Sequence, residues 1–121
     1  MRTICFDLDG VICTQTPSEY ERAVPNQAMI DVINRLHHEG YRIVIHTARF
    51  MTRGGGDPAR ARELGEAFTR AQLERWGVQF DALHLGKPQY DIVVDDRGIF
   101  FEADCDRIYD EVKARAPLDQ R

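Results

Sequence analysis

The sequence has few cysteines, and the three that it has do not suggest disulfide bonds. Cys5, Cys13 and Cys105 are odd in number, and no two of them form a C-x-x-C pair. Small secreted proteins usually use even sets of cysteines, and disulfides are rare in the cytoplasm. We therefore expect reduced thiols in a cytoplasmic protein. The histidines give no metal signal either, because His37 and His38 are neighbours on an expected helix and cannot share one face.

Long apolar stretches and an excess of basic charge are also absent. No apolar run approaches the roughly 18 residues that a membrane span needs. Met1-Arg2 leads straight into an expected strand, so we expect no signal peptide. The net charge of −4 and the pI of about 5.5 disfavour a surface for long nucleic acids. At 121 residues, with an ordinary 43% of hydrophobic residues, the chain is expected to form a single domain over residues 1–115 with a frayed tail over residues 116–121.

Strand and helix patterns alternate along the chain. Strands are expected at residues 3–6, 41–45, 81–85 and 91–94, with a short one at 99–101. Helices are expected after the cap residue Asn26, from the cap residue Asp57 to Gly77, and over residues 104–114. This alternation predicts βαβ units and therefore an α/β fold with a parallel sheet.

Helical spacing also predicts which side chains of the first two helices face the core. In the first helix they are Met29, Ile30, Ile33 and Leu36. In the second helix they are Leu64, Phe68 and Ala71. Between the second strand and this helix, residues 50–56 include three consecutive glycines, and we expect a mobile loop there.

Two carboxylates follow the first expected strand, in the segment Cys5-Phe6-Asp7-Leu8-Asp9-Gly10-Val11. Side chains two residues apart on an extended strand point the same way, so Asp7 and Asp9 can converge on one ligand. Ionised carboxylates that close repel each other, and a shared proton or a divalent cation would stabilise them. Gly10 permits a sharp turn after the pair. A polar strand end gives the same pattern equally well, so partners elsewhere must decide.

Reactive side chains also follow the other expected strands. They are Thr47, Lys87 and the pair Asp95-Asp96. Taken singly, Thr47 is typical of a helix cap, Lys87 of a solvated surface and the acidic pair of a turn. The carboxyl ends of parallel strands meet at one edge of an open α/β sheet, where binding groups collect. All four sets together therefore predict one site.

These groups suit phosphoryl transfer. Carboxylate oxygens favour Mg²⁺, which bridges to phosphate oxygens. One carboxylate can attack phosphorus and form an aspartyl-phosphate. A second carboxyl two residues along can protonate the leaving oxygen and later activate water. An ammonium offsets the charge on the phosphoryl group, and a hydroxyl binds one of its oxygens.

The order of these residues resembles that of phosphatases of the haloacid dehalogenase (HAD) superfamily. Asp7-Leu8-Asp9-Gly10-Val11 is similar to the first motif of the family, and Ile43-Val44-Ile45-His46-Thr47 to the second. Lys87 is similar to the third, and Asp91-Ile92-Val93-Val94-Asp95-Asp96 to the fourth in its paired-Asp form. The resemblance implies a Rossmann-like three-layer α/β/α sandwich with a mainly parallel sheet, a HAD-like core without a cap domain.

The resemblance also implies a catalytic set and a metal site. Asp7 would be the nucleophile and Asp9 the general acid and base, with Thr47 and Lys87 as further catalytic residues. An acid at position 9 favours a phosphatase over a dehalogenase. Mg²⁺ would be held by Asp7, by the backbone carbonyl of Asp9 and by one of Asp95 and Asp96. The sequence leaves open which member of that last pair binds it.

The substrate would be a small phosphorylated metabolite, contacted by Thr47, Ala48, Arg49 and Lys87. The two gaps in which relatives carry a cap hold only loops, helices and a short strand, so loops or a neighbouring subunit of a homo-oligomer would cover the site, or a bulky substrate would find it open. Arg49, Arg53 and the glycines after them are candidates for a loop that faces phosphate or sugar, although solvated charge explains them equally well. The His-Thr-Ala-Arg and Gly-Lys-Pro segments resemble capsule-biosynthesis-type phosphatases, which implies sugar-phosphate and surface-polysaccharide metabolism.

The main hypothesis is therefore a Mg²⁺-dependent phosphomonoesterase. One alternative is a nucleotidase or a phosphatase of nucleic-acid ends, which the acidic pI disfavours for long nucleic acids. Another is a non-enzymatic phospho-acceptor domain similar to a bacterial receiver, which the order of the acidic residues disfavours. A third is an inactive relative that serves as a subunit, and the complete set of acids argues against it.

Overall fold

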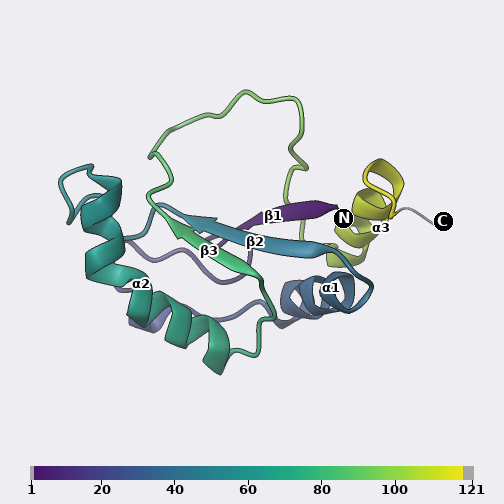
Figure 1. Cartoon of the computed structure of the whole chain (residues 1–121), viewed down its shortest axis with the longest axis horizontal. Helices are drawn as coiled ribbons and strands as arrows, with labels where there is room; N and C mark the ends of the chain where they lie inside the picture. The colour runs from purple at the N-terminus through teal and green to yellow at the C-terminus, as the bar shows by residue number, and fades with distance from the viewer. Residues whose placement is uncertain (1, 119–121) are drawn as a thin grey trace.

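The computed structural model describes residues 2–118, which form three strands and three α-helices in alternating order (Figure 1). The strands are β1 (Thr3–Asp7), β2 (Arg42–Thr47) and β3 (Ala82–Leu85), and the helices are α1 (Gln27–His38), α2 (Pro58–Arg75) and α3 (Cys105–Arg115). The strands are parallel and lie in the order β1-β2-β3. The predicted α/β, Rossmann-like fold class with a parallel sheet is confirmed.

The register of the sheet gives its two faces different environments. Phe6, Ile45 and Leu83 lie side by side across the three strands, and all three are buried. Alternate residues point to the other face, where Cys5 and His84 are exposed. Helix α1 packs against β2 and α3, and α2 packs against β3 (Figure 1). Within residues 2–118, the helices therefore cover the face that carries Phe6.

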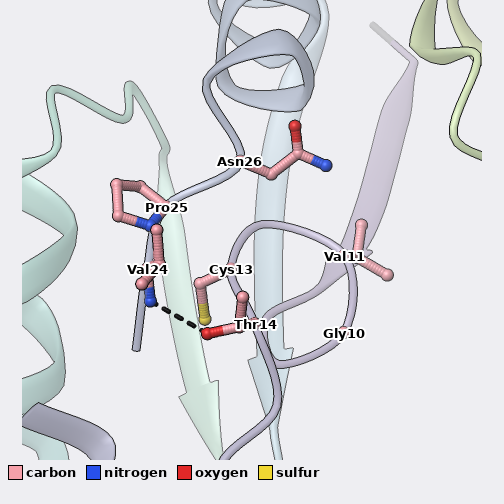
Figure 2. A pocket seen from close by; sticks show the side chains of 7 residues that line it. All are labelled: Gly10, Val11, Cys13, Thr14, Val24, Pro25 and Asn26. Atoms are coloured by element: carbon pink, nitrogen blue, oxygen red, sulfur yellow. Dashed lines mark hydrogen bonds between the residues drawn. The ribbon is translucent and has the colours of Figure 1, made fainter. Parts of the chain in front are cut away.

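A tight loop follows β1 and leads to a pocket. The N–H of Ile12 donates to the carbonyl of Leu8 at 2.9 Å, and the N–H of Asn26 donates to the carbonyl of Ile12 at 2.7 Å. The hydroxyl of Thr14 accepts the N–H of Val24 at 2.9 Å (Figure 2). The pocket has a volume of about 300 Å³ and is lined by Gly10, Val11, Cys13, Thr14, Val24, Pro25 and Asn26 (Figure 2).

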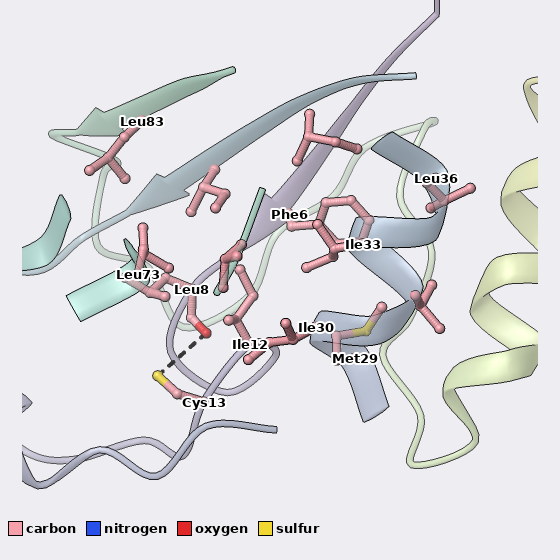
Figure 3. Close-up of a cluster of buried hydrophobic side chains, with 14 of the residues drawn as sticks. Phe6, Leu8, Ile12, Cys13, Met29, Ile30, Ile33, Leu36, Leu73 and Leu83 are labelled. Carbon is pink, nitrogen blue, oxygen red and sulfur yellow. Dashed lines mark hydrogen bonds between the residues drawn. The ribbon is translucent and has the colours of Figure 1, made fainter. Parts of the chain in front are cut away.

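The hydrophobic core lies directly beneath this loop. Figure 3 shows Phe6 of β1, Leu8 and Ile12 of the loop, and Ile33 of α1 in one cluster. Complete burial of a side chain of this size contributes about 1.5–3 kcal/mol. Because Phe6 and Leu8 are anchored in the core, the chain that carries Asp7 between them has little freedom to shift.

Helix α1 follows the sequence prediction closely. The side chain of Asn26 accepts the N–H of Met29 at 3.2 Å and caps the first turn. The four predicted core residues, Met29, Ile30, Ile33 and Leu36, are all fully buried. Gly40 follows the helix with a φ of +111°, which a side chain would disfavour.

Helix α2 begins as predicted but turns a different face to the core. Asp57 caps it by accepting the N–H of Ala59 at 3.0 Å, and Pro58 is its first residue. The predicted apolar stripe is wrong, because Leu64 and Phe68 are exposed. The buried positions are instead Ala61, Gly65, Thr69, Gln72 and Leu73. Gln72 and Gly65 occupy this face because other groups of the protein approach it closely, as described below.

The strands predicted at residues 91–94 and 99–101 are also wrong, because the described chain forms no strand between β3 and α3. This segment arches away from the sheet in Figure 1. Ile92 is 82% exposed, Val94 94% and Phe100 90%. The apolar pattern of a strand stabilises it only where a neighbouring strand pairs with it and its side chains are covered. Neither condition holds here, and β1 remains the edge of the sheet on this side.

The chain after α3 stays in contact with the rest of the protein as far as it is described. The hydroxyl of Tyr41 donates to the carbonyl of Ala116 at 2.9 Å, and Leu118 packs against the core. These contacts join residues 116–118 to the rest of the fold, and residues 119–121 of the predicted tail lie outside the described residues. No helix within residues 2–118 combines the length and the apolar character that a membrane crossing requires.

Candidate active site

Asp7, the last residue of β1, forms an ion pair with Lys87, which follows β3. The Nζ atom of Lys87 lies 3.1 Å from Oδ2 of Asp7. The N–H of Lys87 donates to the carbonyl of Thr47 at 3.2 Å, which ties the chain after β3 to the end of β2. Gly86 has a φ of +97°, and a Cβ at this position would lie 2.7 Å from the ring of Pro58. Glycine is therefore required at the turn that delivers Lys87 to Asp7.

The surroundings of Lys87 keep it charged. Burial opposes the charge, but hydrogen bonds with Tyr90 and Asp7 outweigh this cost, so the pKa of Lys87 is raised. Its ammonium also lies 4.8 Å from the centre of the Tyr90 ring. The neighbouring His46, opposite Asp7 on β2, has its pKa lowered by burial and by the charge of Lys87. Lys87 is therefore the cation that faces Asp7, and His46 remains neutral at neutral pH.

Asp9 has a different cationic partner, Arg49. The Nε of Arg49 lies 3.1 Å from Oδ1 and 3.0 Å from Oδ2 of Asp9, and its Nη2 lies 3.0 Å from Oδ1. This arrangement contacts both carboxylate oxygens and fixes the plane of the group. The side chain of Arg49 is 0% exposed, whereas that of Asp9 is 21% exposed. The acid thus remains accessible while its partner is buried.

The rest of the Arg49 guanidinium contacts the protein. Its Nη1 donates to Oε1 of Gln72 at 2.6 Å, and the amide nitrogen of Gln72 donates to the carbonyl of Tyr20 at 2.8 Å. The ring of Tyr20 lies beneath the guanidinium, with its centre 4.7 Å from Cζ. The sequence predicted that Arg49 contacts the substrate. In the structure its guanidinium instead forms an ion pair with Asp9, and the Arg49 side chain has no exposed surface for a ligand.

Cys13 lies beside the same ion pair. Its thiol donates to Oδ1 of Asp9 at 3.5 Å, and Nη2 of Arg49 lies 3.7 Å from its sulfur. Burial, followed by the charge of Asp9, raises the pKa of Cys13 to about 12 despite the opposing effect of Arg49. The residue is therefore a neutral thiol that donates to the carboxylate.

Thr47 and Ala48 lie between the two ion pairs. Thr47 is fully buried, and its hydroxyl lies 3.4 Å from Oδ2 of Asp9. The hydroxyl oxygen of Thr47 also accepts the backbone N–H of Arg49 at 3.0 Å. Ala48 is partly buried against the core, and its carbonyl accepts the N–H of Met51. The hydroxyl predicted to bind a phosphoryl oxygen thus faces Asp9 in this structure.

The segment predicted as a mobile loop, residues 50–56, is anchored at its start, where Phe50 and Met51 are buried, while Thr52, Arg53, Gly55 and Gly56 are exposed. Phe50 is buried with a φ of +67°, its N–H donates to the hydroxyl of Tyr20 at 3.2 Å, and its ring centre lies 4.9 Å from that of Tyr20. A Cβ on Gly65 would lie 2.1 Å from the Phe50 ring, which explains the glycine on the buried face of α2. Nη2 of Arg53 donates to the carbonyl of Ser18 at 2.7 Å, so this arginine also serves to join the two loops.

The predicted metal ligands are brought together only in part. The carboxylate of Asp95 accepts the N–H groups of Arg97 and Gly98 at 2.9 and 2.7 Å, which lower its pKa. Asp96 is exposed and lies 3.7 Å from the guanidinium of Arg97. Among residues 2–118 there is no group of three or more His, Cys, Asp or Glu side chains that could hold a metal ion. In this arrangement the donor set does not fit a Mg²⁺ ion shared between Asp7 and the acidic pair.

Four contributors to the site were not identified from the sequence: Cys13, Tyr20, Gln72 and Tyr90. A signal existed for Gln72, because a long polar side chain on the buried face of a helix usually has a hydrogen-bond partner. This signal was missed because the predicted core-facing stripe of α2 lies one residue before the buried one along the helix. For Tyr20 and Tyr90 the sequence contains no signal, because both lie in loops whose path only the tertiary structure determines.

Comparisons with known proteins identify the fold. No protein-family model matches the chain, and no curated protein matches it. Among solved structures, a protein from Vibrio cholerae is 23% identical with a TM-score of 0.75, over 92% of this chain and 98% of that one. The D,D-heptose 1,7-bisphosphate phosphatase from B. bronchiseptica, solved with magnesium and phosphate, is 21% identical with a TM-score of 0.50.

The match to the heptose phosphatase covers 98% of this chain but only 65% of that enzyme. At these identities the similarity shows the fold and not the activity. The chain therefore shares its Rossmann-like α/β fold with these two structures.

Proposed function

We propose that the protein is a phosphatase that hydrolyses a small phosphomonoester through an aspartyl-phosphate on Asp7. The observation that supports this most directly is that the two acids at the end of β1, Asp7 and Asp9, have separate cationic partners. Lys87 contacts Asp7 at 3.1 Å, and Arg49 contacts Asp9 at 3.0 Å. Two carboxylates two residues apart can then perform different tasks, because each is in a different electrostatic environment.

In the first step of the proposed reaction, an oxygen of Asp7 forms a bond to phosphorus while the bond to the leaving oxygen breaks. The carboxyl proton of Asp9 passes to the leaving oxygen. In the second step, Asp9 takes a proton from water, whose oxygen bonds to phosphorus as the bond to Asp7 breaks and inorganic phosphate is released. The ammonium of Lys87 attracts the phosphoryl oxygens in both steps. Its raised pKa keeps it charged at neutral pH.

The proposal includes Mg²⁺ as cofactor, held by Asp7, the carbonyl of Asp9 and one of Asp95 and Asp96. Support comes from the oxygen-only ligand set and from the heptose phosphatase, whose structure holds magnesium and phosphate. When bound, the ion would neutralise charge on the phosphoryl group. The segment with Asp95 and Asp96 is not at Asp7 in this structure.

A sugar phosphate is the proposed substrate class, with surface-polysaccharide synthesis in the cytoplasm as the proposed setting. The resemblance of the Thr47 and Lys87 segments to capsule-biosynthesis-type phosphatases supports this choice. The described residues form no cap domain over Asp7, whose side chain is 36% exposed. Such a site accommodates substrates of different size, so a nucleotide is the main competitor as substrate.

The function is tested with purified protein, Mg²⁺ and a generic aryl phosphate. Asp7→Asn is expected to abolish turnover, and EDTA is expected to silence the wild type. Asp110→Asn, an exposed acid of α3, is the matched control and should retain full activity. Hydrolysis by Asp7→Asn at the wild-type rate would contradict the mechanism. A stable phosphoprotein without turnover would instead support the receiver-like alternative, and a panel of sugar phosphates and nucleotides would identify the substrate.

A further inference from the structure

We propose that Arg49 is a positioning residue that fixes the orientation of the Asp9 carboxylate. It would act through Asp9 and would not touch the substrate. This inference rests on the proposed function, because it assumes that Asp9 transfers protons in both steps of the reaction. The evidence is the geometry of the pair and the groups that hold Arg49 in place.

The contacts of Arg49 restrict the carboxylate more than a single ion pair would. Nε and Nη2 donate to both oxygens of Asp9 at 3.0–3.1 Å. Two donors on a planar group prevent rotation of the carboxylate about its last bond. A lysine could balance the charge of Asp9 but could not define this plane.

The guanidinium itself is held from three sides. Gln72 accepts from Nη1 at 2.6 Å, the Tyr20 ring lies 4.7 Å from Cζ, and the sulfur of Cys13 lies 3.7 Å from Nη2. A side chain with this many partners cannot swing out to meet a ligand. Gln72 of α2 thus restrains Arg49, and Arg49 in turn restrains Asp9.

Burial of a full charge is costly unless it serves a partner. Arg49 is the only charged side chain that is buried within residues 2–118, and Asp9 is the only acid it contacts. Asp9, in contrast, is 21% exposed. The asymmetry suits a carboxylate that must meet substrate and water while its orientation is set from the interior.

This role predicts which step of the reaction fails without Arg49. A nitrophenolate leaves without help from an acid, so phosphorylation of Asp7 by an aryl phosphate should continue. Hydrolysis of the aspartyl-phosphate needs a correctly oriented base and should slow by about 100-fold, within the range of general base catalysis. Phosphoprotein should accumulate as a result.

The test uses Arg49→Met and, as matched control, Arg62→Met, an exposed arginine of α2. With an aryl phosphate, Arg49→Met is expected to show a burst of nitrophenolate. Its kcat and KM should fall by the same factor, so that kcat/KM changes little. With an alkyl phosphate, whose leaving group needs the acid, kcat/KM should fall as well. Arg62→Met should behave as wild type with both substrates.

Two further variants keep the inference testable if Arg49→Met folds poorly. Gln72→Met retains Arg49 but loosens it, and should give the same pattern with a smaller decrease. In an Asp9→Asn background, Arg49→Lys should cause no additional loss, because its effect passes through Asp9. The inference would be overturned, and the proposed function left standing, by either of two results. One is a decrease in kcat of Arg49→Met with unchanged KM and no burst. The other is full additivity of Arg49→Lys with Asp9→Asn. A wild-type protein without turnover or phosphoprotein would overturn the proposed function and this inference together.

Discussion

The Nζ atom of Lys87 lies 3.1 Å from Oδ2 of Asp7, although 80 residues separate them in the chain. The contact depends on the parallel order of the strands, because β1 and β3 both end at the same edge of the sheet with β2 between them. It also depends on Gly86, the close neighbour of Pro58. The position of Lys87 thus depends on the backbone twice, through the order of the strands and through the turn at Gly86.

Lys87→Met is expected to lower kcat/KM for an aryl phosphate by about 100- to 1,000-fold, the cost of removing one preorganised charge from a phosphoryl-transfer site. Lys113→Met is the control, because Lys113 contacts Glu39 on the opposite side of the fold. The pKa of Lys87 is raised, so its charge is present at neutral pH and is lost only above the ordinary pKa of lysine, which is about 10.4. Measurement of kcat/KM against pH in wild type and Lys87→Met tests this. A decrease in kcat/KM between pH 7 and 9 that is present in wild type and absent from Lys87→Met would contradict this assignment.

Gly65→Ala should destabilise the protein, even though alanine normally stabilises a helix by about 1 kcal/mol relative to glycine. The new Cβ would lie 2.1 Å from the ring of Phe50, and overpacking of this kind costs about 1–3 kcal/mol. Urea unfolding measures the change. Phe50→Gly removes both the ring and the strained φ of +67°, so the double variant should lose less stability than the sum of the two single variants. Simple additivity would show that the contact is absent in solution.

The contact between α1 and α3 should make stability depend on pH in the acid range. Hydrogen bonds from Tyr109 and Lys113 lower the pKa of Glu39, and the hydroxyl of Tyr109 lies 2.7 Å from Oε2. A lowered pKa contributes stability above the pKa of the unfolded state, and this contribution is lost as the pH falls through the folded-state value. Glu39→Gln should therefore lose stability at pH 7, and its difference from wild type should be smaller at about pH 3. Urea midpoints at both pH values test this; an equal difference at the two would contradict it.

If Mg²⁺ is shared between Asp7 and the acidic pair, the segment with Asp95 and Asp96 must approach β1. Mg²⁺ is then expected to slow amide hydrogen exchange over residues 91–96 in the wild type but not in Asp7→Asn. Of Asp95→Asn and Asp96→Asn, the variant that removes the ligand should need at least about 10-fold more Mg²⁺ for half-maximal activity. Unchanged exchange on addition of Mg²⁺ would contradict a metal site made from this segment.

Much of the fold was predictable because its signals are local. The caps Asn26 and Asp57 and the buried face of α1 depend on residues a few positions apart, and all were predicted correctly. The face of α2 was wrong because Gly65 and Gln72 are buried for partners far away in the chain, Phe50 and Arg49. The strand predicted at residues 91–94 was wrong because a strand needs a neighbour, and apolar alternation does not supply one.

By itself, the sequence determined the alternation of strands and helices and the residues at the strand ends, because periodicity and capping are properties of short segments. From these follow the parallel sheet and a phosphoryl-transfer hypothesis based on Asp7, Asp9, Thr47 and Lys87. Only the tertiary structure decided which acidic and basic side chains form ion pairs. It paired Lys87 with Asp7, turned Arg49 from an expected substrate contact into the buried partner of Asp9, and left Asp95 and Asp96 apart from both. Such pairings depend on loop paths and on the cost of burying charge, which are properties of the whole packed chain.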